Sequence, residues 1–191
     1  MTETGRDNSY IKGILSEHDL IVLRGNNPSA IIKSIKRAND VTALKIARKN
    51  ATKLLSQYLQ QKTPIVFISK IVSEINNAVT SKVIEFSLKE MAKAPPTKFA
   101  WLALGSQGRN EQLLITDQDN ALVYADVNEE SCETTKAYFL EFAEKVTEKL
   151  NYIGFENCPA DMMASNPKWC LSLSEWKIQF NNWIQTPSET S

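Results

Sequence analysis

Apolar residues recur at spacings of three and four along the first half of the chain, a pattern typical of amphipathic helices. The isoleucines at positions 31, 32 and 35 predict a short helix, which Asn39 and Asp40 interrupt. Asp40 is a suitable N-cap for a longer helix, whose apolar positions run through residues 41–59.

A second helical stretch is predicted after Thr63 and Pro64. Thr63 has the character of an N-cap and Pro64 that of a first helical residue, because proline needs no amide hydrogen there. The apolar stripe continues through residues 65–86, and the Pro-rich segment 94–97 ends it. Together these helices predict a long hairpin with a structural role, which we favour over a ligand site.

The second half of the chain alternates between strand and helix patterns. It predicts a buried strand over residues 99–104, a strand over 116–124 and an amphipathic helix over 128–150. A further strand is expected near 154–157 or at 162–163, and a last helix over 169–183. The fold class is therefore α+β: an N-terminal helical hairpin or bundle, followed by a core with a small mixed sheet flanked by helices.

Composition and charge narrow the functions that this fold could serve. The 22 basic and 22 acidic residues give a formal net charge of zero, which argues against a nucleic-acid partner. No apolar run approaches the ~20 residues that span a bilayer, and the N-terminus lacks the apolar core of a signal peptide. We therefore expect a cytoplasmic protein with no membrane partner.

The histidine and cysteine content excludes several catalytic devices. His18 is the only histidine, and its context does not favour a Ser-His or Cys-His mechanism. Cys132, Cys158 and Cys170 are odd in number and widely spaced, so they predict reduced thiols and no zinc site.

The candidate functional residues of the chain lie between positions 105 and 120. Gly105 and Ser106 leave an apolar strand in a turn, where backbone N–H groups and a hydroxyl can approach a phosphate. Asp117 and Asp119 are two residues apart on the next predicted strand, so their carboxylates should share one face. Such a pair calls for a divalent cation, and Mg²⁺ prefers one or two carboxylates completed by phosphates and water. This combination predicts a nucleoside triphosphate site.

Some of the polar residues around this motif have two alternative interpretations. Arg109 could pair with phosphate oxygens through its guanidinium fork, or form a structural ion pair with Glu111 that orders the loop. Gln112 and Asn120 are expected to hydrogen-bond around the same loop, although Asn120 could equally be an exposed polar residue of a strand.

These residues carry a family resemblance. Gly105-Ser106-Gln107-Gly108-Arg109-Asn110-Glu111-Gln112, followed by Thr116-Asp117-Gln118-Asp119-Asn120-Ala121, is similar to a group within the DNA polymerase beta-type nucleotidyltransferase superfamily. That group comprises bacterial nucleotidyltransferases related to the P-II protein uridylyltransferase, usually found in signalling proteins with CBS and cyclic-nucleotide-binding domains. The close match covers about residues 98–126.

The resemblance implies a fold, a reaction and a set of roles. The fold is a polymerase-beta-like core, and the reaction transfers a nucleoside monophosphate to a protein or small-molecule acceptor, such as a P-II-like regulator, in signal transduction. In this two-metal mechanism Asp117 and Asp119 would be catalytic and would bind Mg²⁺ or Mn²⁺. Five residues would bind the nucleotide: Gly105, Ser106, Arg109, Gln112 and Asn120. Glu111 would order the loop.

A third carboxylate is less clearly marked. Complete members of the superfamily carry another acidic residue on a later strand, and the candidates here are Glu156 and Asp161. Neither sits in a clear motif, so an alternative function is a nucleotide-binding sensor with weak or no catalysis. A third reading makes the helical hairpin a homodimerisation module.

The N-terminus has a resemblance of its own. Gly13-Ile14-Leu15-Ser16, with Asp19 and Leu20, resembles the last strand and following helix start of a CBS domain. The alternative is an ordinary strand before a helix that Ser16 caps, with Asp19 at its third position. We expect residues 1–27 to be the end of a CBS domain cut from a longer protein, 28–94 a helical domain and 95–191 a nucleotidyltransferase-like domain.

Overall fold

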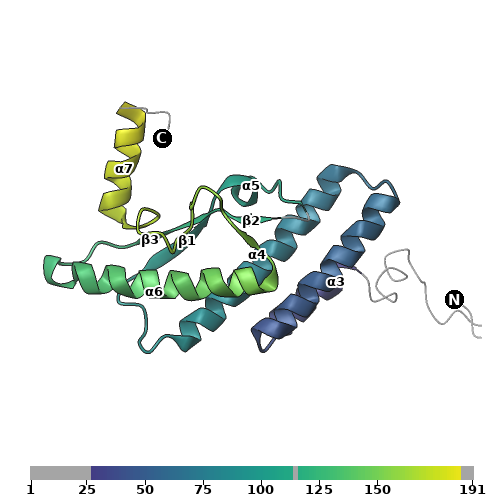
Figure 1. The fold of residues 1–191 in the computed structure, drawn as a ribbon, viewed down its shortest axis with the longest axis horizontal. Coiled ribbons are helices and arrows are strands. Elements are labelled where there is room, and N and C mark those ends of the chain that lie inside the picture. The colour runs from purple at the N-terminus through teal and green to yellow at the C-terminus, as the bar shows by residue number, and fades with distance from the viewer. Residues whose placement is uncertain (1–26, 114–115, 186–191) are drawn as a thin grey trace, which may run out of the picture.

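The chain begins with helices that pack on one another. The computed structural model describes residues 27–113 and 116–185, and its mixed α+β architecture confirms the predicted fold class. Helices α2 (Pro28–Arg37), α3 (Val41–Gln60) and α4 (Ile65–Glu90) form a bundle in which each contacts the other two (Figure 1). The CBS-like motif of the N-terminus lies outside the described residues.

Local capping explains where α2 and α3 begin. The Asn27 carboxamide accepts a hydrogen bond from the Ala30 N–H at 2.6 Å, and the Asp40 carboxylate accepts one from Ala43 at 2.7 Å. Each satisfies an amide that a helix start leaves free. The predicted cap at Asp40 is therefore confirmed.

The predicted start of α4 is wrong by one residue. Pro64, not Thr63, is the N-cap, and no side chain caps this helix. The Pro64 backbone is extended at ψ 132°, and its carbonyl already accepts the first bonds, from Phe67 and Ile68. The first helical residue is consequently Ile65.

The part of the chain after residue 95, which was expected to be nucleotidyltransferase-like, contains two small sheets. Strands β1 (Phe99–Ala103), β3 (Asn120–Tyr124) and β5 (Cys170–Ser172) form one sheet in the order β1-β3-β5. Strand β1 runs antiparallel to β3, and β5 runs parallel to it. A second, two-stranded parallel sheet joins β2 (Asp117–Gln118) to β4 (Glu156–Asn157).

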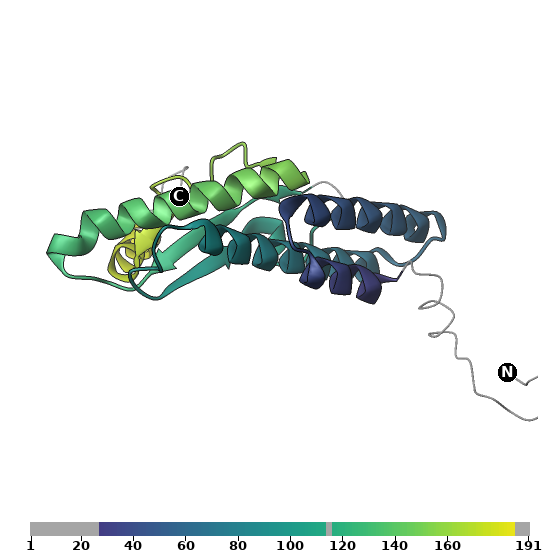
Figure 2. The same cartoon turned by 90° about the horizontal axis from the view of Figure 1, so that it is seen from below.

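One face of the three-stranded sheet is filled by α6 (Glu129–Ile153). Phe139 of α6 stacks on Tyr124 of β3 at 5.0 Å, and Phe142 meets Phe99 edge-on at 5.4 Å. Helices α3 and α4 pack against α6 as well (Figure 2), so one buried apolar cluster runs from the bundle into the sheet. The division predicted between residues 94 and 95 stays a prediction, but the two parts share this core.

The predicted strand over residues 116–124 is divided in the structure. Asp117 belongs to β2 and pairs with β4, whereas β3 begins at Asn120 and pairs with β1 and β5. Asp119 lies between the two strands and belongs to neither. Two neighbouring segments therefore join different sheets, because their partners come from different parts of the chain.

Two further predictions concern the C-terminal part. Of the alternatives for a late strand, the one near residue 156 is confirmed as β4, and residues 162–163 form none. The last helix, α7 (Leu173–Gln185), begins four residues later than predicted. Residues 170–172 pair with β3 instead, which removes the first turn of the expected helix.

Arg48 connects the helical bundle to the site-bearing segment. Its guanidinium lies over the Phe155 ring at 4.1 Å and donates hydrogen bonds to the Gly154 carbonyl at 2.6 Å and to the Thr116 hydroxyl at 2.7 Å. Thr116 immediately precedes Asp117. A side chain of α3 thus holds the chain at the entrance to β2.

Replacing this guanidinium should destabilise the fold. Hydrogen bonds from a charged group are worth about 1.5–3 kcal/mol each in net terms, and Arg48→Gln shortens the side chain as well as discharging it. We expect a loss of about 2 kcal/mol in the free energy of unfolding, measured in urea. Lys49→Gln, at the exposed neighbouring position, is the control. Equal stability of the two variants would contradict this role.

No helix in the described part of the chain is long and apolar enough to cross a membrane.

Candidate functional site

The turn after β1 lies directly over the Asp119 carboxylate. Gly105 opens the single-turn helix α5 (Gly105–Gly108) with a left-handed φ of 50°. A Cβ at Gly105 would overlap the Asp119 carboxylate, 2.9 Å from its Cγ. The Leu104 N–H donates to the Asp119 carbonyl at 2.9 Å, which ties the two segments together. Glycine is therefore required here both by conformation and by space.

Asp119 is buried and incompletely satisfied. Its relative exposure is 9%, and its Oδ1 has no hydrogen-bond partner among the described residues. The Cys158 thiol lies against it: burial raises the pKa of Cys158, and a hydrogen bond to the Asp119 carboxylate raises it further. A buried carboxylate oxygen without a partner is costly unless something binds it.

Asp117 is half-buried and lies in a different ladder from β3. Its register partner across the parallel β2–β4 pair is Glu156, which is exposed. Paired residues of neighbouring strands present their side chains to the same face, and Gln118 next to them turns inward to the Thr147 carbonyl at 3.2 Å. Glu156 is thus alongside Asp117. Asp161 instead sits in a loop, where its side chain accepts from Asn166 at 2.8 Å.

The predicted side-by-side placement of Asp117 and Asp119 assumed one continuous strand. The break at Asp119 removes the ladder on which that alternation depended, so the shared face stays a prediction.

Arg109 and Glu111 form the ion pair that was one of the two readings. The Arg109 Nε lies 2.8 Å from the Glu111 carboxylate, and both side chains are more than 60% exposed. At such exposure an ion pair contributes little to stability. The guanidinium therefore remains accessible at the rim of the turn.

The glutamines of the turn face inward, toward α4. The Gln112 carbonyl oxygen accepts from the Asn76 amide at 2.9 Å, while the Gln107 amide donates to Asn77 at 3.0 Å. Gln112 is 1% exposed, and its own amide nitrogen has no partner among the described residues. These contacts fix the loop to the helical bundle.

Asn120 is buried, so its reading as an exposed strand residue is wrong. Its side-chain oxygen accepts from the Ala164 N–H at 2.8 Å, and its N–H donates to the Met162 carbonyl at 3.0 Å. Asn120 therefore holds the 162–164 segment beside β3 and fixes the backbone next to Asp119.

The contacts with Arg48, Asn76, Asn77 and Cys158 were not predicted from the sequence. Each comes from an element far along the chain from its partner, and no local spacing marks it.

A divalent cation fits the donor set only in part. Carboxylate oxygens are the ligands that Mg²⁺ prefers, and the unpartnered Oδ1 of Asp119 is such a donor. Within residues 27–113 and 116–185, however, no group of three or more His, Cys, Asp or Glu side chains could hold a metal. The protein's share of a metal shell would be one or two carboxylates, which is the arrangement Mg²⁺ adopts when substrate phosphates and water complete it.

A comparison with protein families matches residues 49–190 to the family described as Putative nucleotidyltransferase DUF294. The chain belongs to this family. The nucleotidyltransferase part of the resemblance is thereby confirmed, while the relation to the P-II uridylyltransferase and a CBS-domain parent stay hypotheses. The matched DUF294 region begins within α3, so it includes α4 together with the sheets. Searches among curated proteins and among solved structures found no match.

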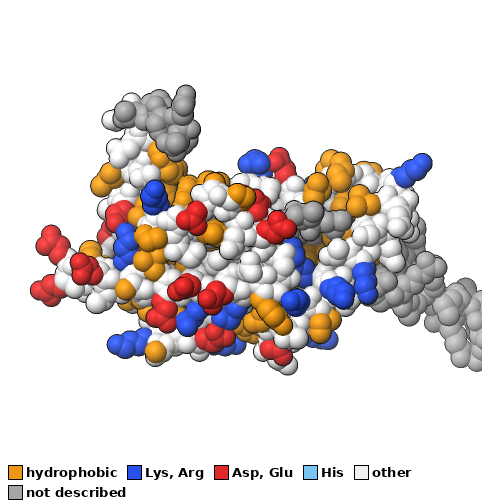
Figure 3. Space-filling model, viewed as in Figure 1, with side chains coloured by type: hydrophobic (Ala, Val, Ile, Leu, Met, Phe, Trp, Pro, Cys, Tyr) orange, Lys and Arg blue, Asp and Glu red, His pale blue; other side chains and the backbone are white. Residues whose placement is uncertain are grey.

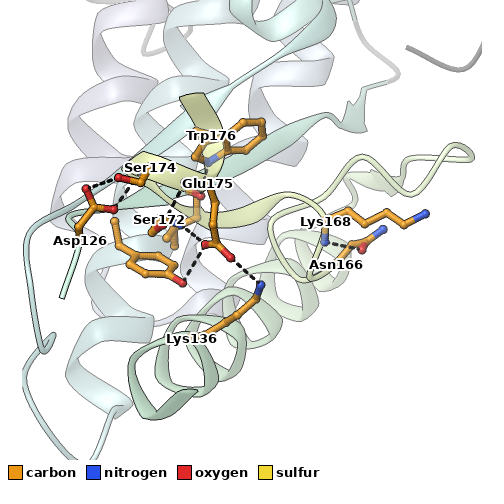
Figure 4. Close-up of polar contacts among 10 residues, drawn as sticks. Asp126, Lys136, Asn166, Lys168, Ser172, Ser174, Glu175 and Trp176 are labelled. Carbon is orange, nitrogen blue, oxygen red and sulfur yellow. Dashed lines mark hydrogen bonds and ion pairs between the residues drawn. The ribbon is translucent and has the colours of Figure 1, made fainter. Parts of the chain in front are cut away.

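Helix α7 of this DUF294 protein is fixed at its first turn by a polar network (Figure 4). Ser172 and Glu175 form a capping box: the Glu175 carboxylate accepts from the Ser172 N–H at 2.7 Å, and the Ser172 hydroxyl accepts from Glu175 N–H at 3.2 Å. Asp126 accepts from both the N–H and the hydroxyl of Ser174, each at 2.9 Å. Lys136 of α6 lies 3.5 Å from Glu175.

The charge of Glu175 should make stability depend on pH. Burial opposes its ionisation, but the Ser172 hydrogen bonds and the Lys136 ammonium outweigh burial and lower the pKa of Glu175. A lowered folded-state pKa adds stability above the unfolded value of about 4.3, and this stability is lost as pH falls through the folded pKa. Glu175→Gln should therefore lower the melting temperature at neutral pH and by less in acid. Glu144→Gln, exposed on α6, is the control; a pH-independent difference would contradict the assignment.

Proposed function

We propose that this protein transfers a nucleoside monophosphate from a nucleoside triphosphate to a protein or small-molecule acceptor. The acceptor oxygen attacks the α-phosphorus, the bond to the bridging oxygen breaks, and pyrophosphate leaves with that electron pair. Membership of the DUF294 family supports the reaction class. The acceptor, a P-II-like regulator among the candidates, and a role in cytoplasmic signalling rest on the sequence resemblance alone.

One observation carries the proposal: Oδ1 of Asp119 is buried without a partner among the described residues, and its carboxylate packs against Gly105, where any side chain would overlap it. The large majority of buried polar atoms in folded proteins have a hydrogen-bond partner, and an unpaired charged oxygen is the costliest exception. An unpaired carboxylate oxygen such as Oδ1 of Asp119 is expected in a site that a bound cation and nucleotide complete.

Each residue then has a definite task. Asp119, together with Asp117, would hold Mg²⁺ or Mn²⁺, which when bound neutralises phosphate charge and polarises the phosphoryl oxygens. Gly105 and Ser106 would bring backbone N–H groups to the triphosphate; α5 has no side-chain cap to occupy them. Arg109, exposed at the rim, would reach a phosphate oxygen by exchanging its Glu111 partner.

Two buried side chains, Gln112 and Asn120, would support these roles indirectly. Gln112 and Asn120 are proposed to act on the nucleotide by keeping the loop and β3 in place, since their side chains bond to Asn76 and Ala164. Of the two candidates for a third carboxylate, Glu156 is favoured because it is in register with Asp117.

A second candidate function is a nucleotide sensor with little or no transfer. Its support is that no third acidic side chain completes a metal cluster in the described residues. The two functions are separated by measuring nucleotide binding and transfer on the same protein. Binding of a labelled nucleotide followed by stable labelling of an acceptor from a lysate of the source cells would support transfer. Binding with no labelled product would support the sensor, and no binding of any of the common nucleoside triphosphates would contradict both.

A further inference from the structure

A pocket of about 430 Å³ lies between α7 and the sheet face opposite α6. Its floor is formed by Leu102 of β1 and Val123 of β3. Its wall is one face of α7, made by residues that recur at helical spacing: Leu173, Trp176, Lys177, Phe180 and Asn181. The volume falls in the range of about 300–1,000 Å³ that is usual for small-ligand sites.

Strand register places this pocket on the same sheet face as Asp119. Along β3, side chains alternate, so Val123 and Ala121 point to one side. The hydrogen bond from the Leu104 N–H to the Asp119 carbonyl extends the β1–β3 register by one pair, so Asp119 points to that side as well. Ala121 is the register partner of Leu102, which therefore shares that side. One pair of residues corresponds to about 7 Å along a strand, so the pocket floor begins one such step from Asp119. A ribose can bridge this separation.

The wall of the pocket is largely apolar and aromatic, and one of its aromatic rings is exposed. Phe180 is 52% exposed although it packs against Trp176 at 5.7 Å and Trp183 at 5.1 Å. In Figure 1, α7 leaves the sheet at its first turn and rises away from it, and Figure 3 shows hydrophobic side chains on α7 and at its base. We call this pocket between the sheet and α7 the wedge; Phe180 lines it one turn beyond Trp176.

The wedge is rigid at its narrow end. The Trp176 indole N–H donates to the Leu122 carbonyl at 3.1 Å, and Trp176 is only 5% exposed. The capping box of Ser172 and Glu175 fixes the same turn. The open pocket is therefore formed before any ligand arrives, which lowers the ordering cost of binding.

We propose that this wedge binds the base of the nucleoside triphosphate and selects among bases. The base lies on the Leu102–Val123 floor against the Phe180 ring, and the Asn181 carboxamide, which offers both a donor and an acceptor, reads its edge. Lys177 lies one turn before Asn181 on the same helix face. This inference rests on the proposed function, because it takes the position of the triphosphate from the Gly105–Asp119 site.

The chemistry of the pocket fits a planar heterocycle better than an acceptor protein. Aromatic and aliphatic walls bind either face of a base, and a single carboxamide at the mouth supplies orientation. The second pocket beside α7, lined by Trp169, Trp183 and Leu171, lies on the other flank of the helix and away from β1 and the Gly105 turn that follows it.

Calorimetry with two kinds of probe tests the inference. Wild type, Phe180→Ala and Asn181→Ala are titrated with each of the four common nucleoside triphosphates and with inorganic tripolyphosphate, all with Mg²⁺. Ile178→Ala is the matched control, because Ile178 is 61% exposed on α7 and does not line the pocket. Phe180→Ala should weaken the best nucleotide by at least about fivefold, the lower end of a lost base–aromatic contact. Asn181→Ala should reduce the spread of affinities among the four bases.

Tripolyphosphate separates this inference from the proposed function. Its affinity should be the same in wild type and in every α7 variant, since it has no base. Nucleotide affinities unchanged by Phe180→Ala and Asn181→Ala would overturn the base pocket and leave the proposed function standing. The same holds if these variants reduce transfer without weakening nucleotide binding, because the wedge would then serve the acceptor. A wild-type protein that binds neither probe would overturn both.

Discussion

Asp117→Asn and Asp119→Asn, singly and together, should abolish the thermal stabilisation that a nucleoside triphosphate with Mg²⁺ gives the wild-type protein. Removing groups that merely support metal ligands already costs about 10–100-fold in affinity, so loss of a ligand should cost more than about 100-fold. A nucleotide at about 100 times its dissociation constant adds about 2.7 kcal/mol. Each kcal/mol raises the melting temperature by about 2–4 °C in a chain of this size.

The amide substitution keeps the shape of the side chain, so the variants should remain folded, which circular dichroism checks. Asp119→Asn also removes a buried charge whose Oδ1 has no partner among the described residues. Its melting temperature without nucleotide should therefore not fall below that of Asp117→Asn. Glu144→Gln, an exposed acid of α6, serves as the control and should retain the full shift. A normal nucleotide-dependent shift in the double variant would refute the assignment of both aspartates.

Gly105→Ala should remove nucleotide binding and destabilise the protein together. A non-glycine residue at a φ of 50° costs about 1–2 kcal/mol. The added Cβ would also come within 2.9 Å of the Asp119 Cγ, so the carboxylate must turn away from its present position. Urea unfolding measures the first effect, and calorimetry with nucleotide and Mg²⁺ measures the second.

Gly154→Ala is a matched control for the backbone term. Gly154 also has a left-handed φ, of 110°, but a Cβ there would meet the flexible Arg48 side chain and not Asp119. This variant should lose stability and still bind nucleotide. If Gly105→Ala binds nucleotide as the wild type does, the space over Asp119 has no part in the site.

The helical part of the fold was predictable because its signals are local. Asp40 caps α3 by bonding to an amide three residues away, and the apolar stripes of α4 and α6 repeat within one element. The strands were less predictable from the sequence. Whether the segment after Thr116 forms one strand or two depends on partners 40 to 50 residues away, in β4 and β5, which no local pattern marks.

In the candidate site, too, features marked by the local sequence were predictable and features set by distant contacts were not. The sequence could predict the turn at Gly105, whereas the pairing of Asp117 with Asp119 stays a prediction. It could not predict that Asn120 faces inward, since that depends on the Ala164 N–H, nor that Cys158 lies against Asp119. The late start of α7 has the same origin, because residues 170–172 are drawn into the sheet by β3.

The central position of β3 also has a consequence for the order of events during synthesis. Its first neighbour, β1, is made before it, but the 162–164 segment that bonds to Asn120 and then β5 are made some 40 to 50 residues later. Parallel strands cannot pair until the crossover between them, here α6, has been completed. When Asp119 has just emerged from the ribosome, the chain therefore carries both acidic residues but lacks β4, β5 and the 162–164 segment that pack beside them. The site matures only when nearly the whole described chain has emerged.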